Sequence, residues 1–173
     1  MAAITHLASN CWYAVAPSAT LTDQPLALPF AGHDFVLFRD RDGSPKAFSD
    51  RCPHRGASLA LGRVEAGCIR CPFHGWAFDA SGHCLEVPAD GPGTSLPARS
   101  HLQKPRVVHE HQGFIWLWWG EGEADPALLP DLPQFDPAQW QQVRSSFPWQ
   151  AHFSRVIESN LDNSHAYWVH KSS

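Results

Sequence analysis

Two short segments, each with one cysteine and one histidine, restrict what this chain can fold into. The first is Cys-x-His at Cys52 and His54, and the second is Cys-x-x-His at Cys71 and His74. Sixteen residues separate His54 from Cys71. Two thiolates and two imidazoles on two loops form a set of metal ligands. The spacing therefore predicts a metal site that two loops close from opposite sides.

The choice of metal depends on how the ligands are divided between the two loops. A Cys₂His₂ set suits tetrahedral zinc, but common zinc fingers place both cysteines on one arm and both histidines on the other. A Rieske [2Fe–2S] cluster needs two cysteines on one iron and two histidines on the other. Loops that each supply one of each provide that set. The division favours the iron–sulfur cluster, with a zinc site as the alternative.

The loop sequences CPHRGA and CPFHGW resemble the Rieske motifs of ring-hydroxylating and related non-haem iron oxygenases. Respiratory Rieske proteins carry an extra cysteine in each loop, and these cysteines form a disulfide. Ala57 and Phe73 occupy those positions here, and Trp76 stands where respiratory proteins have a serine hydroxyl. With fewer hydrogen bonds to the sulfurs, we expect a reduction potential near the low end of the Rieske range, about −150 mV.

The remaining pattern predicts a mainly β fold. Segments with strand character are 12–16, 33–40, 46–49, 76–79, 84–87, 107–110 and 114–120, with two short strands around the Ala66-Gly67 turn. Asp42-Gly43 predicts a tight hairpin turn, and residues 21–31 are expected to be a connection interrupted by prolines. These segments predict an antiparallel Rieske β domain over residues 10–120, with the ligand loops at one end.

After this domain we expect an acidic, proline-rich linker over 121–139 and the start of a second domain over 140–173. Apolar residues recur at helical spacing and predict one helix over 153–170. On it, Asp162 and His165 are neighbours on one face. His165 and His170 are about 140° apart around an ideal helix, so only a break or wide turn near His170 would direct both at one ion. Two ordinary histidines at a polar helix end are the alternative.

The pattern Asp-x-x-His-x₄-His resembles the mononuclear iron motif of Rieske oxygenases, about 90 residues after the cluster loops. The resemblance implies an α+β catalytic domain in which His165 and His170 bind Fe(II). It implies that Asp162 is a catalytic bridge between an iron-ligating histidine and the cluster histidine of a neighbouring subunit, in a homotrimer. The asparagine that often precedes this aspartate in the family is replaced by Ser159.

In the family, the third iron ligand is a carboxylate far downstream of the two histidines. This chain ends at Ser173, three residues after His170. The resemblance therefore covers the whole chain but only the first half of such an enzyme. We expect a truncated sequence, or one that needs a partner chain, and no oxygenase turnover by residues 1–173 alone.

The function implied by the resemblance is that of an oxygenase component in the monooxygenase branch, which includes vanillate demethylase and pheophorbide oxygenase. A ferredoxin or flavin reductase would supply electrons through the [2Fe–2S] cluster to Fe(II), which activates O₂ to hydroxylate or demethylate an organic, aromatic substrate. The alternative is a stand-alone Rieske ferredoxin, an electron carrier. That alternative explains residues 10–120 but not residues 140–170.

Composition excludes several other classes of function. A net charge of −4 gives no reason to expect a nucleic-acid or anionic-membrane partner. No run of 18 apolar residues predicts a membrane span, and the N-terminus shows neither a secretory signal nor a transit peptide. Cys11, Cys68 and Cys84 are expected to be free thiols, which suits a reducing, cytoplasmic location.

Overall fold

A computed structural model describes residues 7–91, 96, 100–103, 105–133, 136, 138–141, 143 and 145–170. The chain divides into two units, Met1–Pro133 and Gln134–Ser173. Residues 1–6, part of the segment examined for a leader sequence, lie outside the described residues, as does part of the predicted linker. Among the described residues, none of the helices has the length and apolar character needed to cross a bilayer.

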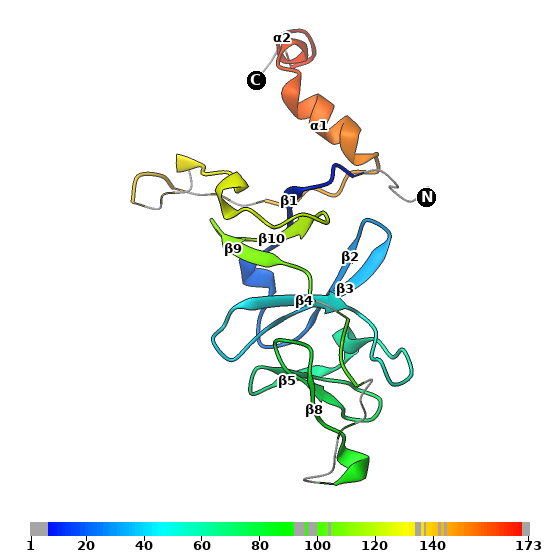
Figure 1. The fold of residues 1–173 in the computed structure, drawn as a ribbon. Coiled ribbons are helices and arrows are strands. Elements are labelled where there is room, and N and C mark those ends of the chain that lie inside the picture. The colour runs from blue at the N-terminus through cyan, green and yellow to red at the C-terminus, as the bar shows by residue number, and fades with distance from the viewer. Residues whose placement is uncertain are drawn as a thin grey trace. The chain divides into compact units, whose positions relative to one another are not determined.

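Three antiparallel sheets make up the first unit, and the predicted mainly β architecture is confirmed (Figure 1). The first sheet has the spatial order β1 (Cys11–Pro17), β10 (Phe114–Trp119) and β9 (Val108–His111). The second has the order β2 (Leu26–Phe30), β3 (His33–Arg39) and β4 (Pro45–Ser49). The third has the order β5 (Arg63–Glu65), β6 (Cys68–Arg70), β7 (Ala77–Phe78) and β8 (Cys84–Glu86). Short 3-10 turns occur at Ser18–Thr20, Leu59–Leu61, Pro88–Asp90 and Pro126–Leu128.

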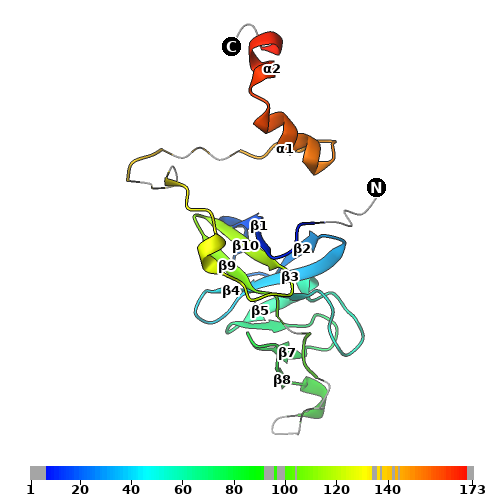
Figure 2. The same cartoon turned by 45° about the horizontal axis from the view of Figure 1, so that its top comes forward.

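Two views show the same order within this unit (Figures 1 and 2). The β5–β8 sheet lies at one end, the sheet of β1, β9 and β10 lies at the other, and β2–β4 lie between them. The first ligand loop connects β4 to β5, and the second connects β6 to β7. Both loops therefore belong to the end that carries β5–β8.

The prediction of an irregular connection over residues 21–31 was wrong, because β2 pairs with β3 along its full length. The misleading signal was Pro29. Proline cannot donate to a ladder, so it is confined to edges of sheets, and β2 is the edge strand of its sheet.

The central strand β3 serves two cores. Its side chains alternate, so that Val36 and Phe38 join one buried cluster while Phe35 and Leu37 join another. The first cluster also contains the thiols of both ligand cysteines. Burying a side chain of this size stabilises the fold by about 1.5–3 kcal/mol. The two ligand cysteines are therefore packed into the hydrophobic core of the unit.

The second unit contains α1 (Phe153–Leu161) and α2 (Ser164–Val169). The predicted single helix over 153–170 was therefore wrong. Asp162 Oδ1 accepts hydrogen bonds from the Ser164 N–H at 3.0 Å and the Ser164 hydroxyl at 2.6 Å. Short polar side chains that bond the local backbone in this way compete with helix continuation. The Asp-Asn-Ser run thus ends one helix and starts the next.

A glycine in the β5–β6 turn allows the cluster-bearing sheet to contact the central sheet. Gly67 has φ +75°, and a Cβ added there would lie 2.2 Å from the backbone nitrogen of Arg41, in the β3–β4 turn. Gly43, in that neighbouring turn, has φ +80° but open space around its Cα. Both glycines have a left-handed backbone conformation, but only Gly67 lies close to the backbone of another turn.

We expect Gly67→Ala to lower the free energy of unfolding by at least about 3 kcal/mol, because backbone strain adds to steric overlap. Gly43→Ala, the matched control, should cost only about 1–2 kcal/mol for its backbone conformation. Urea unfolding followed by circular dichroism measures both values. Equal losses in the two variants would contradict the close approach of the two turns.

Candidate metal centre

The first ligand loop, residues 52–57, is closed by two backbone hydrogen bonds. The Cys52 N–H donates to the Ala57 carbonyl at 2.9 Å, and the Gly56 N–H donates to the Cys52 carbonyl at 2.8 Å. Gly56 adopts φ +73°, which glycine tolerates better than residues with a Cβ. The turn is therefore specified by the sequence of the loop itself.

The second ligand loop, residues 71–76, repeats this arrangement. The Cys71 N–H donates to the Trp76 carbonyl at 2.9 Å, and the Gly75 N–H donates to the Cys71 carbonyl at 3.1 Å. Gly75 adopts φ +72°. The loops thus have the same backbone pattern, and they differ in placing the histidine two or three residues after the cysteine.

Both cysteine thiols are buried, with Cys52 3% and Cys71 1% exposed. Burial, and to a lesser extent the adjacent Cys71 thiol, raise the pKa of the Cys52 thiol to about 11. Backbone N–H groups of His54 and Arg55 donate to the Cys52 sulfur and act in the opposite direction. Metals bind thiolates rather than thiols, so metal binding here would be coupled to proton release.

The two loop histidines are exposed and face each other. Their Nδ1 atoms are 3.1 Å apart, and their ring centroids are 4.5 Å apart. Two ring nitrogens this close can bind one ion from neighbouring positions when both imidazoles are neutral. The Trp76 ring stacks on His54 at 4.8 Å with an interplanar angle of 1°. The sequence indicated only that Trp76 lacks the hydroxyl of the respiratory proteins, and it did not predict this stacking.

The division of these four residues into a buried thiol pair and an exposed imidazole pair tests which metal they fit. A zinc site would need three or four ligands around one ion. Across the part of the chain that the structure describes, no group of three or more His, Cys, Asp or Glu side chains is placed to hold a single ion. Two separate pairs match the two irons of a Rieske cluster better.

Comparison with known families agrees with this geometry. The model of the Rieske [2Fe-2S] domain matches residues 11–106, more than half of the chain. The chain belongs to the Rieske family. A [2Fe–2S] cluster is therefore the cofactor of this domain, and Cys52, Cys71, His54 and His74 are the residues that fit it.

Relatives of this Rieske protein are oxygenase components. It is 36% identical over 169 residues to the 4beta-methylsterol monooxygenase of Methylococcus capsulatus, covering 93% of this chain and 44% of that protein. It is 33% identical over 165 residues to the vanillate O-demethylase oxygenase subunit of a Pseudomonas species, covering 95% of this chain and 45% of the relative. The chain spans about half the length of the curated relatives it matches.

A solved structure of dicamba monooxygenase bound to dicamba has the same fold. The TM-score is 0.80 at 31% identity, and the match covers 94% of this chain and 48% of the other. The similarity extends beyond the Rieske domain and includes most of the second unit.

In the second unit, the break between the helices lies next to the predicted iron-binding residues. The His165 and His170 ring centroids are 5.5 Å apart, and His165 Nδ1 lies 3.6 Å from Asp162 Oδ2. His170 follows the last residue of α2, where the backbone leaves the helical conformation. Hydrogen bonds from Ser164 hold the pKa of the Asp162 carboxyl below its usual range. Asp162 and His170 thus each lie beside His165, although no three such side chains of the described residues are placed to hold a single ion.

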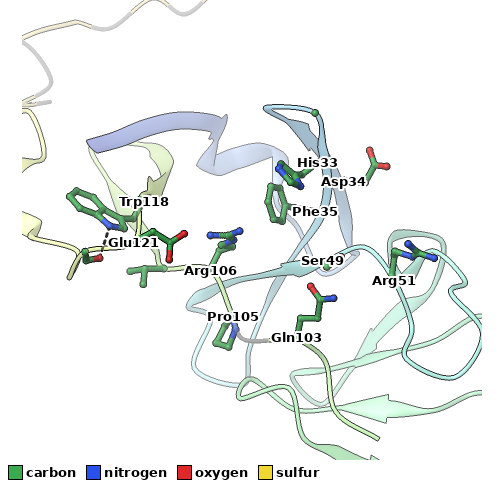
Figure 3. Close-up of a pocket in the computed structure, with 14 residues that line it drawn as sticks. His33, Asp34, Phe35, Ser49, Arg51, Gln103, Pro105, Arg106, Trp118 and Glu121 are labelled. Carbon is green, nitrogen blue, oxygen red and sulfur yellow. Dashed lines mark hydrogen bonds between the residues drawn. The ribbon is translucent and has the colours of Figure 1, made fainter. Parts of the chain in front are cut away.

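The first unit also has a cleft of about 690 Å³, shown in Figure 3. The Arg106 guanidinium lies 5.7 Å from the centroid of Phe35 and 5.5 Å from that of Trp119. None of the candidate metal ligands lines this cleft. A smaller cavity of about 260 Å³, lined in part by Cys52 and His101, adjoins the first loop. Arg51 and Gln103 line both hollows, so the larger cleft borders the cavity beside the first loop.

We expect Cys71→Ala to lose both irons and both sulfides of the cluster, because a cluster with a missing thiolate ligand is not retained. Cys84→Ala is the matched control, since Cys84 is another buried, free cysteine of the same core cluster. This control should keep about two irons per chain. Iron and acid-labile sulfide analysis of anaerobically purified protein measures both. Retention of the cluster by Cys71→Ala would contradict the assignment.

Proposed function

We propose that this chain is the electron-receiving part of a Rieske non-haem iron oxygenase. The observation that carries the proposal is the polarity of the site, with both cysteine ligands in the core and both histidine ligands at the surface. A cluster held this way exchanges electrons through its histidine edge. Similarity to a monooxygenase and to an oxygenase subunit of a demethylase supports the oxygenase part of this proposal.

The surface around the histidine pair suits a protein electron donor. His54 and His74 are exposed, and Phe73, which is 60% exposed, lies against His74 with ring centroids 4.2 Å apart. Aromatic side chains are enriched in protein–protein interfaces, so Phe73 is suited to contact such a donor. We assign a ferredoxin or a flavin reductase as the donor.

The electrons then go to a mononuclear Fe(II), whose chemistry when bound is the activation of O₂. His165 and His170 would hold this iron through imidazole nitrogens. Asp162 Oδ1 is occupied by the Ser164 N–H and hydroxyl, which leaves Oδ2 beside His165 to orient that ring. In a homotrimer, Asp162 would also face the cluster histidine of a neighbouring subunit and bridge the two metal sites.

The substrate class we propose is an organic, aromatic molecule that is hydroxylated or demethylated. Vanillate and dicamba, named for the related demethylase and monooxygenase, are both aromatic.

All five cysteines of the chain are free, which supports a reducing compartment such as the cytoplasm.

A stand-alone electron carrier explains less of the chain. Similarity to the oxygenase relatives covers 93–95% of this chain, whereas the match to the Rieske domain model ends at residue 106. A carrier would have no use for the histidine pair of the second unit. The comparisons therefore favour the oxygenase component over the carrier.

We expect the cluster-loaded chain to bind one further Fe(II) under anaerobic conditions, measured by isothermal titration calorimetry. His165→Ala and His170→Ala should each weaken this binding by at least about tenfold, because each removes an imidazole ligand. His152→Ala, which removes an exposed histidine of the same unit, should leave the binding unchanged. Equal Fe(II) binding by the wild-type protein and His165→Ala would count against the iron site.

A further inference from the structure

Arg70 is the last residue of β6 and immediately precedes the second ligand loop. Its guanidinium makes three hydrogen bonds of 2.7 Å, one from each nitrogen. Nη1 donates to the Gly75 carbonyl, Nε donates to Glu65 Oε2, and Nη2 donates to Glu86 Oε2. The side chain is only 17% exposed. The network therefore connects β5, β6 and β8 to the loop.

A hydrogen bond to the Gly75 carbonyl fixes the backbone of the second ligand loop next to His74. This carbonyl belongs to the peptide that joins Gly75 to Trp76, directly after His74. The Gly75 N–H is bound to the Cys71 carbonyl, so hydrogen bonds hold both sides of the residue. A Cβ on Gly75 would lie 3.1 Å from the Pro88 side chain, so a third neighbour limits the position of the backbone.

Fixing this peptide affects both imidazole ligands. His74 lies within the same loop, one residue before Gly75. The fixed peptide also contains the backbone nitrogen of Trp76, and the Trp76 ring stacks on His54 of the first loop. A shift of the Gly75–Trp76 peptide would therefore move His74 directly and His54 through the stacked indole.

We propose that Arg70 is a positioning residue of the cluster site, which holds the second loop so that His54 and His74 keep their facing geometry. This inference deepens the proposed function and depends on it, because the cluster is what the two histidines are positioned for. A guanidinium is suited to the task, since its planar fork reaches three acceptors at once. A lysine ammonium is a compact point charge on a flexible stem.

The neighbouring strand offers a matched control. Arg63 on β5 is the cross-strand partner of Arg70, and it also pairs with Glu65. Its side chain is 54% exposed, and it donates a hydrogen bond to Glu65 on the same strand. Arg63→Met thus removes a positive charge and one ion pair from the same sheet without removing the contact to Gly75.

The experiment compares the wild-type chain with Arg70→Met, Arg70→Lys and Arg63→Met. The first readout is the half-life of the cluster absorbance in the presence of a ferrous chelator. The second is the electron paramagnetic resonance spectrum of the dithionite-reduced protein. The third is hydrogen exchange of residues 71–76 in protein without cluster. Circular dichroism reports whether each variant folds.

We expect Arg70→Met to shorten the cluster half-life on the order of tenfold, as the loss of a charge-assisted hydrogen bond predicts. Its resonance signal should broaden as the imidazole positions become heterogeneous. Arg70→Lys should behave like Arg70→Met, although it keeps the charge. Arg63→Met should match the wild-type protein. If Arg70→Met does not fold, Arg70→Lys decides the question.

Wild-type behaviour of Arg70→Met or Arg70→Lys would overturn the inference, as would an equal defect in Arg63→Met. If the wild-type chain binds no cluster, the proposed function fails, and hydrogen exchange then decides the role of Arg70. In that case, faster exchange of residues 71–76 in Arg70→Met supports the role. A loop equally unprotected in both proteins refutes it.

Discussion

The requirement that most constrains this molecule is to bury two thiols while leaving two imidazoles in water. Burial alone disfavours a thiolate, and the raised pKa of Cys52 shows that cost. Backbone N–H groups directed at the sulfur offset part of it, and they come from the same tight turn that sends His54 outward. The loop that buries the cysteine is therefore also the loop that exposes the histidine.

Buried side chains and hydrogen bonds elsewhere in the first unit hold the two ligand loops in place. Phe38 and Phe48, on adjacent strands of the central sheet, are fully buried in the same hydrophobic core as both ligand cysteines. Asp50 fastens the far side of the first loop by accepting from the Ser58 hydroxyl and the Ala60 N–H. Each ligand loop thus has a charged anchor just before its cysteine, a carboxylate for the first loop and the Arg70 guanidinium for the second.

Local sequence information was sufficient to predict the Rieske domain, because its signal lies in the residue types and short spacing of Cys52, His54, Cys71 and His74. Most strands followed from alternation for the same reason. The contacts of Arg70 could not be predicted, since Glu86 is sixteen residues away and only strand pairing brings it near. The break between α1 and α2 was predictable in principle from Asp-Asn-Ser, but the apolar periodicity on both sides concealed it.

The end of α2 determines how His165 and His170 lie relative to each other. A helix that continued through His170 would separate the two histidines by about 140°, too far around the axis for one ion. In the structure, the backbone leaves the helical conformation at His170, and the two imidazole rings lie 5.5 Å apart. Asp162 is the C-cap of α1, and its Oδ1 accepts hydrogen bonds from Ser164 at the start of α2, while its Oδ2 lies 3.6 Å from His165 Nδ1. Ser164 thus fixes which carboxylate oxygen of Asp162 lies toward His165.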